Sequence, residues 1–306
     1  MASSHWQGQG EPANESLRVT EVIGLDLNFA LSYVGVADSY GIMSAYGYAA
    51  PNDVIPQAKA AAQRALRIDP DPAHAAYAKL SSDYDWNRLE AEREYKRSIE
   101  LNPNVALTHY QYGSACLVPL GRFEEGANEL KRALDLKPLS VAAAGCLAGA
   151  YVFARRYDLA VQTGREALVL EPNHPTARIW LAFAYDASGM YADAISLCQN
   201  TLRSDPSNQD CLQIAGYGYT KMGRRREAEE IIRRFEDLAR TQYSVAYRPA
   251  VIHALLGDKD KAFAGLEKSF AAHDWGIGLI KVDPFVDSLR DDQRFKDLIK
   301  RMGMSQ

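Results

Sequence analysis

The chain has 306 residues, of which 47% are hydrophobic, and its 35 basic and 39 acidic side chains give a formal net charge of −4. A chain of this length and apolar content can bury a sizeable core, which excludes a disordered tail. The nearly balanced charge gives no general reason to expect nucleic acid or an anionic membrane as a partner.

The first 24 residues are polar and rich in turn-forming residues, and they are predicted to form a flexible N-terminal segment (1–24). They lack the basic region followed by a hydrophobic stretch that is typical of a secretory signal, so we expect a cytoplasmic protein. The longest apolar run, Val141 to Ala154, has 14 residues. Because about 20 residues are needed to span a bilayer, this run is predicted to be a packed core helix.

Five later segments end in a proline at an almost constant interval. The prolines are Pro70, Pro103, Pro138, Pro172 and Pro206, which are 33, 35, 34 and 34 residues apart. A period near 34 indicates a repeated helix-turn-helix unit. Each proline is predicted to end the second helix of its unit, because proline lacks an amide donor and clashes with the preceding turn.

Small residues recur at fixed distances before these prolines, which predicts close contact between neighbouring helices. The positions twelve, eight and five residues before each proline hold Ala58, Ala62, Ala65; Ala91, Tyr95, Ser98; Gly126, Leu130, Ala133; Ala160, Gly164, Ala167; and Ala194, Cys198, Thr201. Within each unit, Gly121, Gly189 and Gly223 supply the backbone freedom that a turn after a helix needs.

This spacing of alanines, aromatics and prolines resembles the tetratricopeptide-repeat (TPR) family over about residues 28 to 270. More narrowly, the segments 30–51, 83–104 and 279–303 resemble the TPR portions of bacterial signalling proteins, in which a similar array follows an adenylate cyclase, a protein kinase or a winged-helix regulator. The segment before Leu25 is too short for such a domain. The chain thus resembles a detached sensor or scaffold portion, either as a natural short protein or as a fragment.

The resemblance implies an all-α fold, a TPR α-solenoid that forms a right-handed superhelix of about seven antiparallel helix pairs. The array is expected over residues 25–272 and a C-terminal capping segment over 273–306. In the first unit, residues 41–53 are predicted to be an inserted loop. A solenoid must cover its last apolar face, and the residues expected to do so are Phe285, Leu289, Phe295, Leu298, Ile299 and Met302.

The resemblance also implies a concave groove, lined by the second, fifth, ninth and twelfth residues of each unit. The candidate partner-binding residues at these positions are Asp83, Gln111, Val152, Ile179, Phe183, Asp186, Gln213, Tyr217 and Tyr247. Because the groove positions include no Lys or Arg, they predict against a clamp for a terminal carboxylate. Small, apolar and amide side chains suit an apolar peptide, although tight superhelical packing explains them equally well.

Motifs for catalysis, cofactors and metals are missing from the sequence. It contains no Gly-x-Ser-x-Gly, no phosphate-binding glycine loop and no metal-ligand spacing among its six histidines. The four cysteines, Cys116, Cys146, Cys198 and Cys211, are predicted to be buried free thiols. The arginines at 224–226, 233 and 234 alternate with glutamates, which predicts a solvated, self-paired face rather than a phosphate-binding one.

These observations predict a non-catalytic protein-protein interaction scaffold or regulatory module that binds a peptide or protein partner in its concave groove. The first alternative is a small-molecule sensor, with its ligand near Phe183 and Tyr217; a compact closed pocket would favour it. The second alternative is an enzyme of unrecognised type. No cofactor, metal, nucleic acid or membrane is expected, and the sequence does not indicate the identity of the partner.

Overall fold

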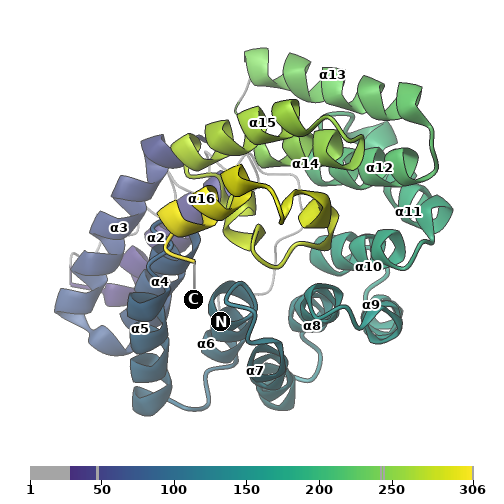
Figure 1. Ribbon diagram of the computed structural model, residues 1–306. Coiled ribbons are helices and arrows are strands. Elements are labelled where there is room, and N and C mark those ends of the chain that lie inside the picture. The colour runs from purple at the N-terminus through teal and green to yellow at the C-terminus, as the bar shows by residue number, and fades with distance from the viewer. Residues whose placement is uncertain (1–27, 46–47, 242, 244, 305–306) are drawn as a thin grey trace.

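The computed structural model describes residues 28–45, 48–241, 243 and 245–304. Over these residues the chain forms seven consecutive helix pairs and no strand, and the pairs stack into a curved array (Figure 1). The pairs are α2 Ala30–Ala45 with α3 Pro51–Ile68, α4 Pro70–Asp83 with α5 Arg88–Leu101, α6 Ala106–Gln111 and its continuation η1 Tyr112–Leu117 with α7 Phe123–Leu136, α8 Val141–Phe153 with α9 Tyr157–Leu170, α10 Pro175–Ala187 with α11 Tyr191–Ser204, α12 Gln209–Lys221 with α13 Arg225–Thr241, and α14 Tyr247–Leu255 with α15 Lys259–Ala272.

The prolines end the second helices as the sequence predicts. The helices α3, α5, α7, α9 and α11 each end two residues before the proline of their unit. In α5 and α11 the residue between the helix and the proline is Asn102 or Asp205, whose amide still bonds back into the last turn. The proline then has no amide to continue the ladder, so each helix stops at the same place in its unit.

The small residues let the helices touch. Ala58, Ala91 and Ala160 are completely buried. A side chain on Gly113 would begin 2.7 Å from the carbonyl oxygen of Gly126 in the facing helix, so the two backbones are in contact there. Burial of these positions confirms the packing that the repeat predicts.

The turns within the pairs use the left-handed backbone region. Gly121, Gly189, Gly223 and Gly257 have φ values of 84°, 81°, 72° and 83°. At the equivalent position between α8 and α9 the chain has Arg155, with a φ of 61°. A residue with a side chain is strained in this region by about 1–2 kcal/mol, so the repeat imposes its turn even where glycine is missing.

The predicted loop at residues 41–53 is largely helical, so that prediction is wrong. Gly41 to Ala45 continue α2, and Pro51 to Asp53 open α3. The extra turn of α2 is held by tertiary contacts: Gly41 and Ser44 are buried, and the Tyr84 hydroxyl donates a hydrogen bond of 2.9 Å to the Gly41 carbonyl.

The C-terminal segment covers the last apolar face, as predicted. It consists of the 3-10 helices η2 Trp275–Leu279 and η3 Pro284–Leu289, followed by α16 Gln293–Arg301. The five predicted capping residues Phe285, Leu289, Phe295, Leu298 and Met302 belong to the same core cluster as α14 and α15, and Ile299 packs against it. Arg301 and Arg294 of α16 form ion pairs with Glu267 and Asp260 of α15.

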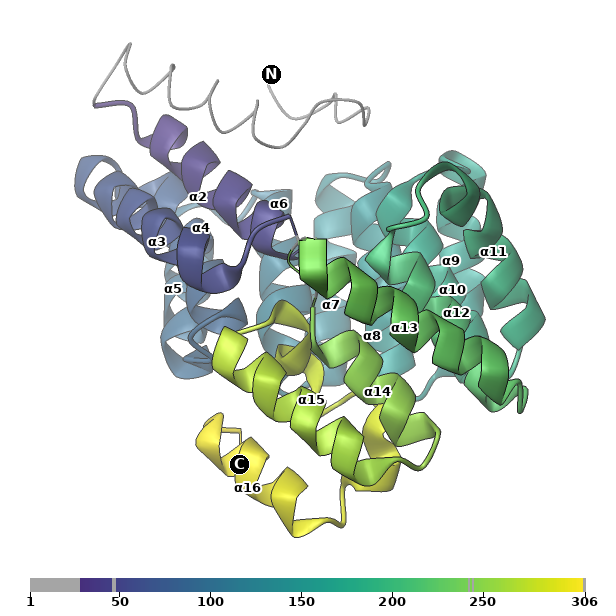
Figure 2. The ribbon, with the colours of Figure 1, turned by 90° about the horizontal axis from the view of Figure 1, so that it is seen from above.

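The same segment also reaches back to the second helix pair. The Nδ1–H group of His273 donates to the Tyr84 carbonyl at 2.7 Å, and Arg88 Nη2 donates to the Gly278 carbonyl at 2.7 Å. The indole of Trp86 stacks on the His273 ring with 4.6 Å between centroids. Figures 1 and 2 show the resulting arrangement, in which the C-terminal segment lies across one side of the curved array and joins its two halves.

No helix in the described part of the chain is both long enough and apolar enough to cross a membrane.

Candidate functional site

A half-enclosed cavity of about 500 Å³ lies on the inner side of the array. The first helices of the pairs supply most of its wall, and residues 275–285 of the C-terminal segment supply much of the remainder, together with Arg88 of α5. The cavity is therefore formed by residues from nearly the whole length of the array. Its place agrees with the concave groove that the resemblance implies.

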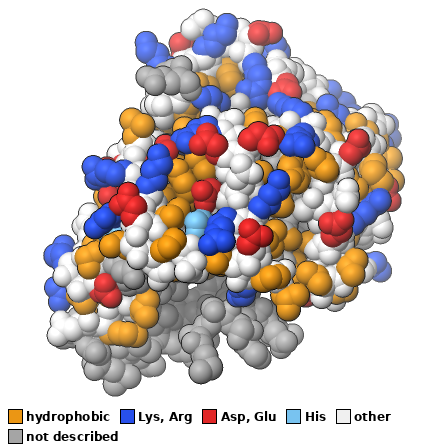
Figure 3. Space-filling model, turned by 90° about the horizontal axis from the view of Figure 1, so that it is seen from below, with side chains coloured by type: hydrophobic (Ala, Val, Ile, Leu, Met, Phe, Trp, Pro, Cys, Tyr) orange, Lys and Arg blue, Asp and Glu red, His pale blue; other side chains and the backbone are white. Residues whose placement is uncertain are grey.

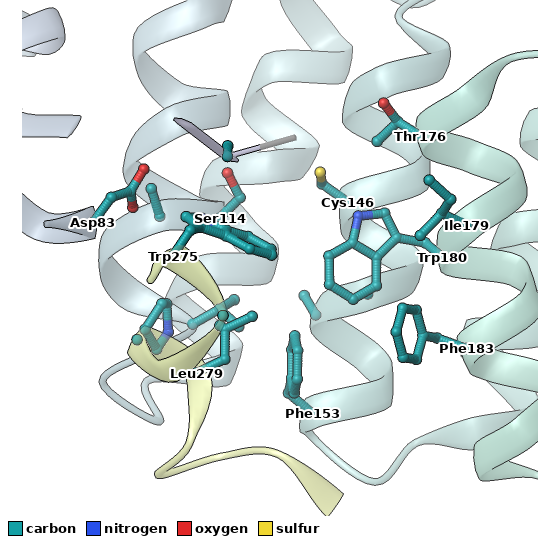
Figure 4. Close-up of a pocket in the computed structure, with 18 of the residues that line it drawn as sticks. Asp83, Ser114, Cys146, Phe153, Thr176, Ile179, Trp180, Phe183, Trp275 and Leu279 are labelled. Atoms are coloured by element: carbon teal, nitrogen blue, oxygen red, sulfur yellow. The ribbon is translucent and has the colours of Figure 1, made fainter. Parts of the chain in front are cut away.

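Aromatic side chains line the middle of the cavity on two opposite sides. Figure 4 shows Trp275 and Leu279 of the C-terminal segment facing Trp180 and Phe153 of the inner helices. The rings of Phe153 and Trp180 meet edge to face, with 5.6 Å between centroids. Such contacts hold large apolar side chains in fixed positions, so the wall formed by Phe153 and Trp180 is preformed.

Gly149 makes room for the Trp180 indole. A side chain at position 149 would begin 2.6 Å from the ring. The glycine in the middle of α8 thus has a packing reason, and it decides how far the indole lies from α8.

The wall also contains a π-helical stretch, η1, between Tyr112 and Leu117. Ser114 and Ala115 of this stretch line the cavity, and the Ala115 carbonyl accepts a hydrogen bond of 2.6 Å from the Ser82 hydroxyl. Single π-helical turns inside α-helices occur frequently at functional sites.

At one end of the cavity, α2 and α4 bring together several charged groups. Lys79 Nζ lies 2.9 Å from Asp83 Oδ2. Burial alone would lower the pKa of Lys79, but the neighbouring Asp83, Tyr84 and Asp38 raise it well above its ordinary value. Burial raises the pKa of Asp38, which opposes its ionised form.

Arg88, the first residue of α5, lies at this end too, and it is only 6% exposed. Its Nη2 donates to the Gly278 carbonyl, whereas its buried Nε and Nη1 atoms have no hydrogen-bond partner. Burial lowers the pKa of the guanidinium, and the nearby Asp83 partly offsets this effect.

At the other end, the charged and polar groups are paired with one another. Arg248 Nη2 lies 2.6 Å from Asp210 Oδ1. The Tyr247 hydroxyl donates to Asp283 at 2.7 Å, and the Phe285 amide donates to the same carboxylate at 2.8 Å. Although burial raises the pKa of Asp283, its two hydrogen bonds favour the ionised form.

Most of the predicted groove residues surround this cavity. The structure brings together seven of them: Asp83, Gln111, Val152, Ile179, Phe183, Gln213 and Tyr247. The other two do not line it. Tyr217 is fully buried under Phe285, with 4.6 Å between the ring centroids, and Asp186 is 3% exposed with both carboxyl oxygens unpartnered. The burial of Tyr217 follows in part from the C-terminal segment, whose Phe285 covers it.

No Lys or Arg stands at the predicted groove positions, but Lys79, Arg88 and Arg248 line the cavity. These residues do not stand at the repeat positions from which the groove was predicted, and Arg88 opens a second helix. Trp275 and Leu279 were missed as well. No signal in the sequence could have found them, because the Arg88–Gly278 hydrogen bond that positions them joins residues 190 positions apart.

The described residues give no arrangement suited to metal binding: no group of three or more His, Cys, Asp or Glu side chains could hold an ion. Cys146 is the thiol that faces the cavity, and burial raises its pKa to about 11. A thiol with such a pKa stays protonated near neutral pH and is a poor nucleophile. All four cysteines are free and buried, as predicted.

Three of the five arginines predicted to be self-paired on the outer surface bear out that prediction. Arg224, Arg225 and Arg233 form ion pairs with glutamates three or four residues away on α13. On a different face, seen from below in Figure 3, side chains of both signs are interspersed among hydrophobic ones.

Comparison with known protein families finds a match within the repeats. Residues 153–235 match the family described as anaphase-promoting complex, cyclosome, subunit 3. No curated protein matches the sequence.

Three solved structures are similar over most of this chain. A tetratricopeptide repeat protein from Parabacteroides merdae is 15% identical, with a TM-score of 0.56, over 89% of this chain and 98% of that one. PilF from Pseudomonas aeruginosa is 20% identical, with a TM-score of 0.50, over 72% and 95%. A chain of the APC/C hetero-tetramer Cut9–Hcn1 is 16% identical, with a TM-score of 0.62, over 94% of this chain and 58% of that one. The helix pairs, their 34-residue period and these likenesses show that the fold is a TPR-type α-solenoid.

Proposed function

We propose that this chain is a non-catalytic interaction module that binds a short segment of a partner protein in the inner cavity. The observation that carries the proposal is the cavity itself, whose volume of about 500 Å³ lies within the range of about 300–1,000 Å³ typical of ligand sites. TPR-type repeats are generally protein-interaction scaffolds, which supports a polypeptide as the occupant.

The C-terminal segment limits the size of that occupant. Because residues 275–285 form part of the wall, an extended peptide could follow the whole inner surface only by displacing them. A short segment with one apolar side chain between Trp180 and Leu279 needs no such displacement. Gln111 and Gln213 would supply amide groups for its backbone, since side-chain amides both donate and accept hydrogen bonds.

A photo-reactive amino acid at Ile179, which lines the cavity, tests this proposal. We expect irradiation in cells to attach a partner polypeptide at position 179, and the substitution Ile179→Lys to abolish co-purification of that same partner. The matched control is Val169→Lys on the outer side of α9, where the side chain is 81% exposed. Equal recovery of the partner with both lysine variants would contradict binding in the cavity.

The second candidate is a small-molecule sensor, and one observation favours it: the C-terminal segment covers part of the groove and is bonded to α5. A ligand there would contact the inner helices and the C-terminal segment at once, and would stabilise their association. The resemblance to the repeats of bacterial signalling proteins supports such a regulatory setting. Thermal stabilisation of the purified chain by a small molecule, without any peptide, is the expected result; stabilisation by peptides alone would contradict it.

A further inference from the structure

We propose that the cavity binds a small carboxylic acid with a flat apolar body, with the carboxylate against Arg88 and the body between Trp275 and Trp180. This inference rests on the second candidate function, the small-molecule sensor, and names the chemical class of its ligand.

Arg88 is a buried cation that forms one hydrogen bond and no ion pair among the described residues. Its side chain is 6% exposed, and its Nε and Nη1 atoms have no acceptor. A buried cation without a carboxylate partner is costly, because its lost hydration is not replaced. A ligand carboxylate at this end of the cavity supplies the missing opposite charge, and interactions between ionised groups are the stronger ones.

The other charged groups that line the cavity leave the end at Arg88 positive. Lys79 and Arg248, the other cations that line the cavity, are paired with Asp83 and Asp210 at 2.9 and 2.6 Å. Asp38 faces the same end as Arg88, and its burial opposes its ionised form. Lys281, on the C-terminal segment, lies close enough to Arg88 for the two positive charges to repel each other. Asp83 acts on Arg88 but is already ion-paired with Lys79, so this end of the cavity has more positive than negative groups and favours an anion.

The space beside Arg88 lies between large apolar side chains. The Gly278 carbonyl that holds Arg88 lies one residue from Leu279 and three from Trp275, and both of these side chains face Trp180 and Phe153 across the cavity (Figure 4). An acid bound to Arg88 therefore places its body between aromatic walls. Flat rings gain from stacking and edge contacts with such walls, which favours an aromatic body.

The C-terminal segment also limits the size of the ligand. The C-terminal segment is joined to the array on both sides of the cavity, by His273 to Tyr84 and by Asp287 to Arg155. This arrangement favours a free acid of a few tens of atoms or fewer over the C-terminus of a polypeptide, and the volume of about 500 Å³ suits such a ligand.

The test uses matched pairs of probes on the full chain. Benzoate, 3-phenylpropanoate and indole-3-acetate are each compared with their primary amides by calorimetry and by tryptophan fluorescence. We expect at least one acid to bind about tenfold more tightly than its amide, which corresponds to one ion pair gained in a partly desolvated site. The tryptophan fluorescence, to which Trp180 and Trp275 contribute together with the other two tryptophans of the chain, should change with the same midpoint.

Two substitutions locate the site. Arg88→Gln should remove the preference for the acid, whereas Arg93→Gln, on the same helix and 69% exposed, should leave it unchanged. Because Arg88→Gln also loses the bond to Gly278, a second variant that keeps Arg88 is needed. Ile179→Trp fills the cavity and should abolish binding of the acids while circular dichroism stays that of the parent.

The results distinguish failure of the carboxylate inference from failure of the sensor candidate. If no acid binds more tightly than its amide, the cavity does not select a carboxylate and the inference is overturned. If an acid and its amide bind equally well, the small-molecule sensor remains supported. If neither acids nor amides bind, the inference and the sensor candidate fail together. If a peptide with a free C-terminus binds and the free acids do not, the occupant is a polypeptide and the inference is wrong.

Discussion

The middle of the array is held by contacts between neighbouring helices, whereas the C-terminal segment is held by contacts with residues far away in the sequence. Between α6 and α11, each helix packs on its neighbours in the sequence, and the same small residues and turns recur every 34 residues. From Trp275 onward the helices are short, and their contacts reach residues far away, such as Arg88 and Arg155. The comparison teaches that a repeat can build a groove from local packing alone, whereas closing that groove requires an irregular segment.

The largest expected effect comes from removing equally buried leucines in the two regions. Leu130 in α7 and Leu289 in η3 are both 0% exposed. We expect Leu130→Ala and Leu289→Ala each to lower the free energy of unfolding by about 3 kcal/mol, measured by urea denaturation, because each leaves a cavity in a packed core.

The two variants should nevertheless differ in the cavity. Only Leu289→Ala loosens the segment that holds Trp275, so only this variant should shift the tryptophan emission of the folded chain and speed proteolysis near residue 280. Equal protease sensitivity in both variants would show that the array and the C-terminal segment unfold as one unit, contrary to this comparison.

Glycines in close contact offer a second contrast. A side chain at Gly113 would begin 2.7 Å from a backbone oxygen, whereas one at Gly278 would meet its nearest neighbour, the guanidinium of Arg88, at an ordinary contact distance of 3.6 Å. Gly113→Ala should destabilise the chain by about 2 kcal/mol, because two helix backbones must separate. Gly278→Ala should change stability by less than about 0.5 kcal/mol. Thermal melts of the two variants side by side check this prediction.

A pH effect is expected where the C-terminal segment leaves α15. Burial raises the pKa of Asp274 to about 7, although the Ala246 amide donates to its carboxylate at 2.8 Å. Because the folded chain holds this proton more tightly than the unfolded chain, the contribution of Asp274 to stability is full below about pH 4 and is lost as the pH rises through about 7.

Asp274→Asn should remove this dependence, since the amide oxygen can still accept from Ala246. Relative to the parent chain, the variant should gain on the order of 2 kcal/mol between pH 5 and pH 8, measured by denaturation at both values. A constant difference between the two proteins across this range would mean that Asp274 stays ionised throughout.

The smallest effect concerns the turn that lacks its glycine. Gly189→Ala should cost about 1 kcal/mol, because alanine is strained at a φ of 81°. Arg155→Gly relieves the same strain but loses the ion pair of Arg155 with Asp287 of the C-terminal segment. We expect these two changes nearly to cancel, within about 0.5 kcal/mol, because exposed ion pairs contribute little. A loss larger than that of Gly189→Ala would show that the ion pair matters for closing the array.

The sequence by itself determined the solenoid. Helix ends at the prolines, contacts at Ala58, Ala91 and Ala160, and turns at the glycines all depend on neighbours within about one repeat, so a 34-residue period is enough to predict them. For the same reason the pattern placed residues such as Phe183 and Gln213 on the inner face.

Only the tertiary structure decided which residues of the inner face are buried and which line the cavity. The extra turn of α2 depends on a hydrogen bond to Tyr84, and the burial of Tyr217 depends on Phe285. Arg88, Trp180 and Trp275 meet at one cavity because the C-terminal segment folds back over 190 positions. A contact of that range leaves no periodic trace in the sequence, because it occurs once and joins segments that share no pattern.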